Sequence, residues 1–105
     1  MKVKIIEGSC LARIAAMKLG SRKVAMVLGN RILLYNTSRG EFLSNKTWVL
    51  HELKHVEQYQ RAGFVTFILG YLVESMRKGY RANKYELEAR AAEHDESLLL
   101  RYELE

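Results

Sequence analysis

The stretch from Asn45 to Ala62 has no glycine or proline, and its apolar residues recur three or four positions apart, as on one face of a helix. Within it, His51 and His55 lie one helical turn apart, so both imidazoles project from the same side. Two imidazoles at this spacing can bind one Zn²⁺, with each nitrogen about 2.0–2.1 Å from the ion. Glu52 follows His51 directly, where it can take a proton from a zinc-bound water. This stretch predicts a helix with a metal site on it.

The His-Glu-x-x-His pattern is short enough to arise by chance. A shuffled chain of this composition would contain it roughly one time in a hundred. The alternative is a helix with two solvated or interfacial histidines. The apolar face around the motif, which includes Val49, Leu53 and Val56, favours the metal site.

The chain has 105 residues, which is the size of one domain with a single modest core. Cys10 is the only cysteine, so no internal disulfide can form. The first ten residues lack the apolar core of a signal peptide, and the longest apolar run, Phe64–Val73, is too short to span a bilayer. We therefore expect a cytoplasmic protein with no membrane span.

The net charge of +5 is unevenly distributed along the chain. Residues 1–47 hold nine Lys and Arg against two acids, whereas residues 48–105 hold eight against ten. The cations of the first half are scattered and lack interleaved aromatic residues, so they indicate a solvated face and no nucleic-acid partner. The acidic second half suits a divalent cation.

The first half of the chain has the pattern of a strand, a helix and a β-hairpin. Ser9 can cap a helix that ends at Gly20. Gly29-Asn30 suits a type II′ turn, because glycine takes the first central position of that turn. The expected elements are a strand over Lys2–Ile6, hairpin strands over Val24–Leu28 and Arg31–Tyr35, and a loop over Asn36–Gly40.

The second half has the pattern of three consecutive helices. The expected helices are one from a cap at Ser44 or Asn45 to about Ala62, one over Phe64–Lys78 stopped by Gly79, and one from a cap at Asn83 to about Tyr102. Their short connections predict antiparallel neighbours. We therefore expect a single domain over residues 1–105 with an α+β fold. A small sheet, made of the hairpin plus the N-terminal strand, would pack beside an N-terminal helix and these three helices.

A catalytic zinc site needs a third protein ligand and one open position. The metzincin pattern would require Gly at position 58 and His at position 61, but the chain has Gln58 and Arg61. The only other histidine is His94. Among carboxylates, Glu86 and Glu88 stand about 200° apart on a helix, so only one can face the metal.

The spacing of residues alone does not decide between these two carboxylates. Glu86 shares its helix face with the small Ala89, which would allow a close approach to the histidine helix. Two other interpretations of Glu86 are equally open: a capping-box partner of Asn83, and an ion pair with Arg90 four residues later.

The segments His51-Glu-Leu-Lys-His-Val-Glu-Gln58 and Tyr85-Glu-Leu-Glu-Ala-Arg90 together resemble the gluzincin class of zinc metallopeptidases. In size and layout the chain is most similar to the one-domain minigluzincins, and the resemblance covers roughly Trp48–Glu93. It implies a minimal zincin-like fold in which His51, His55 and Glu86 bind zinc and Glu52 is the general base and acid.

One position departs from the gluzincin pattern. Many members carry an acid where this chain has Arg90, and that acid orients a ligating histidine. Since a ligating histidine usually donates its other N–H to a partner, the partner must come from elsewhere, and Glu93 is the candidate on the face of Glu86. Tyr80, Arg81 and Tyr85 are candidates for the oxyanion donor.

The expected activity is zinc-dependent hydrolysis of a peptide or an unfolded protein. The resemblance to gluzincins implies that the substrate binds extended along a sheet edge, which the hairpin Val24–Tyr35 would supply by strand addition. Self-association through the apolar face of Phe64–Val73, or blocking of the site by the acidic tail Arg101–Glu105, would keep the enzyme latent. The alternatives are a zinc-binding module with little or no turnover and an interaction protein that uses Phe64–Val73 as its contact surface.

Overall fold

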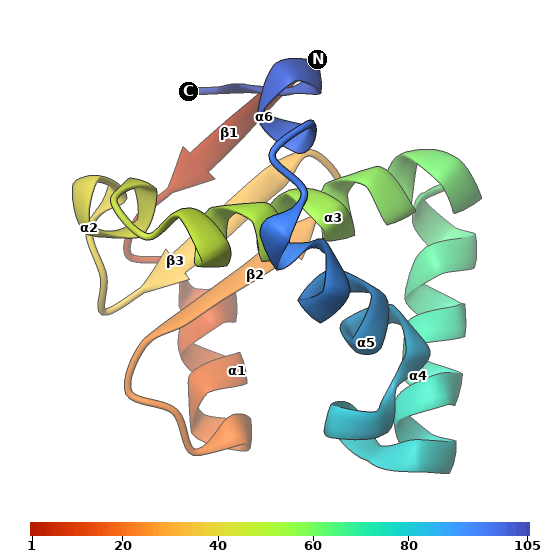
Figure 1. The fold of residues 1–105 in the computed structure, drawn as a ribbon. Coiled ribbons are helices and arrows are strands. Elements are labelled where there is room, and N and C mark those ends of the chain that lie inside the picture. The colour runs from red at the N-terminus through yellow and green to blue at the C-terminus, as the bar shows by residue number, and fades with distance from the viewer.

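A four-stranded mixed sheet organises the computed structural model, which describes residues 1–105 (Figure 1). The strands are β1 (Lys2–Ile6), β2 (Val24–Leu28), β3 (Arg31–Tyr35) and β4 (Glu103–Leu104). Their order is β2-β3-β1-β4, with β2 antiparallel to β3, and β1 parallel to both β3 and β4. Gly29 has a φ of +68°, as the first central position of a type II′ turn requires. Because β2 is the first strand in this order, it lies at an edge of the sheet with one side unpaired.

Six α-helices accompany the sheet: α1 (Cys10–Leu19), α2 (Arg39–Leu43), α3 (Lys46–Ala62), α4 (Phe64–Ala82), α5 (Lys84–Ala91) and α6 (Leu98–Arg101). The side chains of Ser9 and Asn45 cap α1 and α3 as the sequence predicts, each accepting a backbone N–H three residues later. Gly79 has a φ of 80° and leaves the helical conformation, so the regular part of α4 ends where the sequence places its stop. None of the helices has the length and apolar character needed to cross a bilayer.

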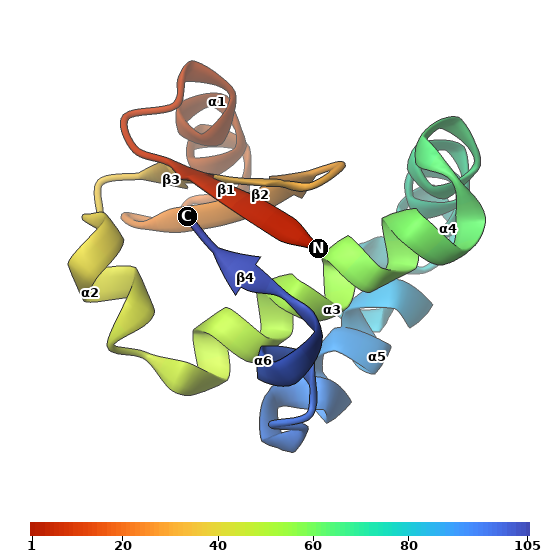
Figure 2. The ribbon, with the colours of Figure 1, turned by 90° about the horizontal axis from the view of Figure 1, so that it is seen from above.

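The sheet separates two apolar layers (Figure 2). Helix α1 covers one face and packs the small side chains of Ala12 and Ala16 against Val24 and Leu33. Helix α3 covers the other face and contributes to the main core, whose fully buried members include Leu50, Leu53, Val56, Ile32 and Leu34. The site described below lies in the middle of α3, where this helix meets α4 and α5.

The loop expected over Asn36–Gly40 is shorter than predicted, because helix α2 begins at Arg39. Ser38 caps this helix by accepting the backbone N–H of Glu41. This Ser-x-x-Glu spacing is a recognised start signal, and it outweighs the unfavourable Gly40.

The prediction of a third long helix, from Asn83 to about Tyr102, is wrong beyond Ala91, where α5 ends. The chain forms a 3₁₀ helix over Ala92–His94, a turn, the short helix α6 and strand β4. The carboxylate of Asp95 accepts hydrogen bonds from the backbone N–H and the hydroxyl of Ser97, which competes with a helical path. The acidic tail therefore does not reach the histidines. It pairs with β1 at the opposite edge of the sheet from β2.

Candidate metal centre

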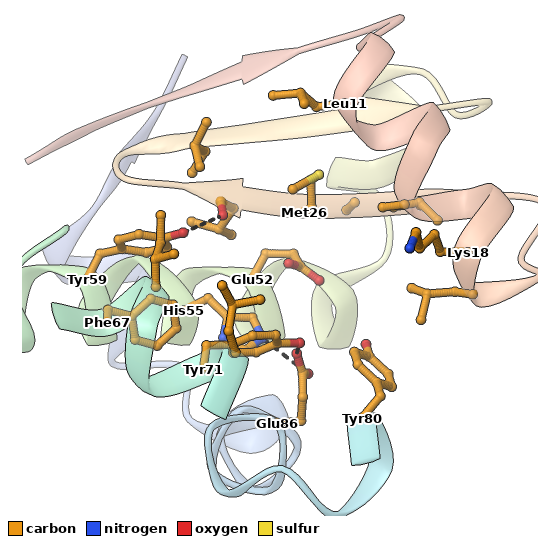
Figure 3. Close-up of a pocket in the computed structure, with 18 of the residues that line it drawn as sticks. Leu11, Lys18, Met26, Glu52, His55, Tyr59, Phe67, Tyr71, Tyr80 and Glu86 are labelled. Carbon is orange, nitrogen blue, oxygen red and sulfur yellow. Dashed lines mark hydrogen bonds and ion pairs between the residues drawn. The ribbon is translucent and has the colours of Figure 1, made fainter. Parts of the chain in front are cut away.

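Three side chains from two helices converge on one point. Nε2 of His51 lies 3.0 Å from Oε1 of Glu86, and Nε2 of His55 lies 3.2 Å from the same oxygen. The ligand atoms of the three residues all lie within 4.8 Å of one another. Helix α3 supplies both imidazoles from consecutive turns, and α5 supplies the carboxylate from its first turn. Figure 3 shows His55 and Glu86 pointing toward each other from these two helices. The structure thus joins the residues that the two motifs singled out.

The other interpretations of Glu86 do not hold in the structure. The backbone N–H of Asn83 donates to the carbonyl of Tyr80, so Glu86 does not complete a capping box. The guanidinium of Arg90 donates to the carbonyl of Arg81, so it is not an ion-pair partner of Glu86. Glu88 is exposed and does not belong to the cluster; its carboxylate accepts a hydrogen bond from the amide of Gln58.

Each imidazole is oriented by a partner at its other nitrogen. Nδ1–H of His51 donates to Oε2 of Glu93 over 2.8 Å, which places Glu93 where the sequence suggested an orienting acid. Nδ1–H of His55 donates to Oε1 of Gln58, also over 2.8 Å. Sequence reasoning missed Gln58, although its i,i+3 spacing from His55 was a usable signal. It also missed Tyr71, whose hydroxyl donates to Oε2 of Glu86 and which no local pattern marks.

These hydrogen bonds define the electrostatics of the cluster. With protons on both Nδ1 atoms, the Nε2 lone pairs of His51 and His55 face a carboxylate oxygen, so a proton or a metal cation must lie between them. Burial lowers the pKa of both histidines, but their bonds to carboxylates outweigh it and the net pKa is raised. Burial raises the pKa of Glu86, yet the two imidazoles hold it well below its usual range. The site is therefore built to hold positive charge.

Glu52 is buried beside this cluster without belonging to it. It is 5% exposed, and it lines the same cavity as His51, His55 and Glu86 (Figure 3). Burial raises the pKa of its carboxyl group to about 8. A carboxyl group in this place is available to a water molecule or a substrate in the cavity.

The cavity has a volume of about 530 Å³ and follows the edge of the sheet. All of strand β2 lines it, with α1 on one side and α3 and α4 on the other. Of its 20 lining residues, 15 are hydrophobic, so its polar groups are concentrated at the histidines. An apolar cleft with a few convergent polar groups is the usual form of a ligand site.

The three candidates for an oxyanion donor have different places. Tyr80 lines the cavity, and burial raises the pKa of its hydroxyl to about 12, so it keeps its proton at neutral pH. The ring of Tyr85 packs edge-on against Phe67, 5.0 Å away between centroids, and neither Tyr85 nor Arg81 lines the cavity. Only Tyr80 is in position to reach a group bound there.

The unpaired edge of β2 offers backbone hydrogen bonds to the cavity. In a hairpin with a two-residue loop, the residues flanking the loop bond to each other, and the pairs alternate from there. The N–H and C=O of Ala25 and Val27 therefore point away from β3, toward the unpaired edge. The hydrogen-bonded pairs of this hairpin are Leu28–Arg31, Met26–Leu33 and Val24–Tyr35. The carbonyl of Val27 accepts from the hydroxyl of Tyr59 over 3.1 Å. Both groups of Ala25 and the N–H of Val27 remain for a ligand.

Comparisons of the chain with models of protein families, with curated protein sequences and with solved structures found no match. The resemblance to gluzincins therefore stands on the two motifs.

Proposed function

We propose that this chain is a zinc-dependent endopeptidase with a minimal zincin-like active site. The observation that carries the proposal is the convergence of two Nε2 atoms and one carboxylate oxygen, while the Nδ1 atom of each histidine is held by a separate partner. A histidine that binds a metal through one nitrogen usually donates the other N–H in this way.

The donor set fits zinc. Two imidazoles and one carboxylate are the ligands of a known class of catalytic zinc site, which leaves a fourth position open. Ligands about 2.0–2.1 Å from a tetrahedral ion lie about 3.3 Å apart, and the oxygen of Glu86 lies 3.0 and 3.2 Å from the two nitrogens. When bound, the ion supplies Lewis-acid chemistry, which lowers the pKa of a water ligand to about 7 and polarises a carbonyl group.

Two residues of the chain would handle protons and charge around the reacting carbonyl. Glu52 lines the cavity next to both histidines. Burial raises its pKa to about 8 and so favours the protonated form at neutral pH, whereas a zinc ion bound beside it would favour the carboxylate. That carboxylate could accept a proton from water and deliver it to the leaving amine. Tyr80 lines the same cavity and can donate its hydroxyl proton in a hydrogen bond to the developing oxyanion.

An extended peptide is the substrate that suits this cavity. A backbone laid along β2 would pair with Ala25 and with the N–H of Val27, as in β-strand addition. Pairing through the backbone requires a segment without its own secondary structure, so unfolded proteins and flexible loops are the favoured substrates.

The replacement Glu52→Gln tests this function. We expect hydrolysis of an unstructured protein such as casein to fall about 10²–10⁴-fold, which is the usual contribution of general acid–base catalysis, while zinc stays bound. The matched control is Glu96→Gln on the exposed surface, where the carboxylate pairs only with Lys46. Cleavage by Glu52→Gln at the wild-type rate would contradict the assignment of Glu52.

A zinc-binding module with little or no turnover would have the same ligands. Absence of cleavage by the zinc-loaded wild type, with one zinc per chain, would favour that alternative. Blocking by the C-terminal tail is not part of this proposal, because β4 occupies the far edge of the sheet.

A further inference from the structure

The mouth of the cavity is bordered by the ends of two helices. The C-terminal ends of α1 and α4 both project past the sheet, at the end of the molecule opposite the chain termini (Figure 1). Residues from both helices line the cavity and are also exposed to solvent: Lys18 and Leu19 from α1, and Leu72 and Tyr80 from α4. We call this border the rim; it comprises the end of α1 with the turn that follows it, residues 18–22, and α4 from Leu72 to Ala82.

The rim exposes large apolar side chains. Leu19 is 46% exposed, Leu72 52%, Tyr80 43% and Met76 86%. Single apolar residues on a surface are ordinary, but Leu19, Leu72 and Tyr80 also line a cavity that is itself apolar. Met76 follows Leu72 by four residues within the regular part of α4, so these two side chains share one helix face. Exposed apolar side chains beside an apolar cavity are a candidate contact surface for a partner.

The rim is also cationic. Lys18 is in the last turn of α1 and Arg22 lies in the turn after it, while Arg77 and Arg81 lie in the last turns of α4. All four are exposed and none forms an ion pair. Residues 8–40 contain no Asp or Glu at all.

The second wall of the mouth is equally poor in acids. Residues 58–85 contain a single carboxylate, Glu74. It is buried, and it accepts a hydrogen bond from the backbone N–H of Lys84 and pairs with Lys78. The exposed carboxylate of Glu41 pairs with Lys23, next to Arg22. No carboxylate pairs with Lys18, Arg22, Arg77 or Arg81 themselves.

We propose that the rim docks the mouth of the cavity onto a lipid bilayer that contains anionic lipids. A surface with apolar side chains among Lys and Arg matches the boundary between acyl chains and anionic headgroups. Leu19, Met76 and Tyr80 would enter that boundary, while the cations contact the headgroups. The protein binds at the surface, in keeping with helices that cannot cross the bilayer.

Two other partners fit the rim less well. A second copy of the chain would bring unpaired cations against unpaired cations, which costs free energy. A nucleic acid would satisfy the cations but leave Met76 and Leu72 in contact with water or phosphates. Only an anionic and amphiphilic surface matches both properties of the rim.

In this orientation, the cavity and strand β2, which lines it, would open toward the membrane surface. Peptide segments that lie at the bilayer surface would then reach the unpaired edge of β2 first. Binding itself goes beyond the proposed peptidase function and does not require a metal, so it can be measured whether or not the peptidase proposal holds.

Flotation with lipid vesicles tests the proposal. We expect the full chain to float with vesicles of equal parts phosphatidylcholine and phosphatidylglycerol, and not with phosphatidylcholine alone. Binding should weaken as salt is added, because the attraction of the cations is screened. The double replacement Arg22→Glu/Arg77→Glu should lower partitioning about tenfold or more.

Two further variants separate the rim from net charge. The control variant Lys4→Glu/Arg31→Glu changes the net charge by the same amount as Arg22→Glu/Arg77→Glu. Its two exposed residues are register partners on β1 and β3, away from the rim. This variant should lower partitioning less than about twofold at moderate salt. Met76→Ser leaves the charge unchanged and should still weaken binding, because it removes an apolar side chain from the boundary.

Four results would overturn the proposal. The first is that folded wild-type protein does not bind the anionic vesicles. The second is an equal loss of binding in the two charge-reversal variants. The third is binding to a single-stranded oligonucleotide that matches vesicle binding, with no effect of Met76→Ser on either. The fourth is a dimer seen by sedimentation that Arg22→Glu/Arg77→Glu dissociates.

Discussion

Helices α3 and α4 are consecutive in the chain but differ in burial: α3 buries polar side chains, whereas α4 exposes apolar ones. Helix α3 buries four polar residues: Glu52, His55, Glu57 and Gln58. Helix α4 leaves five apolar residues more than half exposed: Val65, Leu69, Leu72, Val73 and Met76. Burying polar groups costs free energy unless they are bonded, and exposed apolar groups contribute little to folding. The proposed metal site would account for the buried Glu52 and His55 of α3, and the proposed membrane contact would account for the exposed apolar side chains at the end of α4.

The two buried carboxylates of α3 show how position decides their properties. Burial raises the pKa of Glu52 to about 8. Burial also acts to raise the pKa of Glu57, but Lys54 and Arg101 outweigh it and the net pKa is lowered. The guanidinium of Arg101 lies 2.6 Å from Glu57, which links α3 to α6. Glu57 therefore belongs to an ion-pair network that holds the fold, and Glu52 belongs to the cavity.

The largest expected effect compares one leucine from each helix. Leu53 is fully buried on α3, and Leu53→Ala should lower the free energy of unfolding by about 2–5 kcal/mol. Leu69 is 58% exposed on α4, and Leu69→Ser should change the free energy of unfolding by no more than about 0.5 kcal/mol. Urea denaturation of the metal-free variants measures both. A loss at Leu69 as large as that at Leu53 would show that the face of α4 that carries Leu69 is also packed against another part of the chain.

The second comparison concerns the two glutamates of α5. Glu86→Ala removes a ligand and should weaken zinc affinity more than about 100-fold, beyond what loss of an outer partner costs. Glu88→Ala removes an exposed carboxylate that accepts from Gln58, and should leave affinity nearly unchanged. Affinity is measured by competition with a chelator, on protein shown by circular dichroism to be folded. The opposite ranking would refute the assignment of Glu86.

A smaller effect is expected at the orienting partner of His51. Glu93→Ala should weaken zinc affinity about 10–100-fold, because the imidazole loses the acceptor that fixes its tautomer and orientation. Glu96→Ala, three residues later on the exposed surface, is the control and should have no effect. Equal affinities for the two variants would mean that Glu93 does not orient the ligand.

The parts of the fold that follow from local signals were predictable. Helix α3 was visible from its apolar spacing, and its cap at Asn45 and its end before Gly63 are local features. The hairpin followed from Gly29-Asn30 between two β-rich runs. Strand β4 could not be foreseen, because Glu103 and Leu104 pair with Lys2 and Val3 from the other end of the chain. Long-range pairing of this kind leaves no periodic signal in two residues.

The metal site also has parts that local sequence signals predicted and parts that only the packing of the chain revealed. The spacing of His51 and His55 on one helix predicted that their imidazoles would share a face, and the two rings stand 5.1 Å apart between centroids. The choice of Glu86 over Glu88 needed the resemblance to gluzincins, since helical spacing left both open. Tyr71 reaches Glu86 from α4, and only the packing of α4 against α5 brings it there. The apolar rim depends on which face of each helix the fold leaves uncovered.

The central claim is that α3 and α5 hold one zinc ion between them, and the metal content of purified protein tests it most directly. After equilibration with zinc and removal of unbound metal, wild type should hold about one Zn²⁺ per chain. His55→Ala should hold none, whereas His94→Ala, at an exposed histidine outside the cluster, should hold as much as wild type. Wild-type protein without zinc, or His55→Ala with a full complement, would contradict the account.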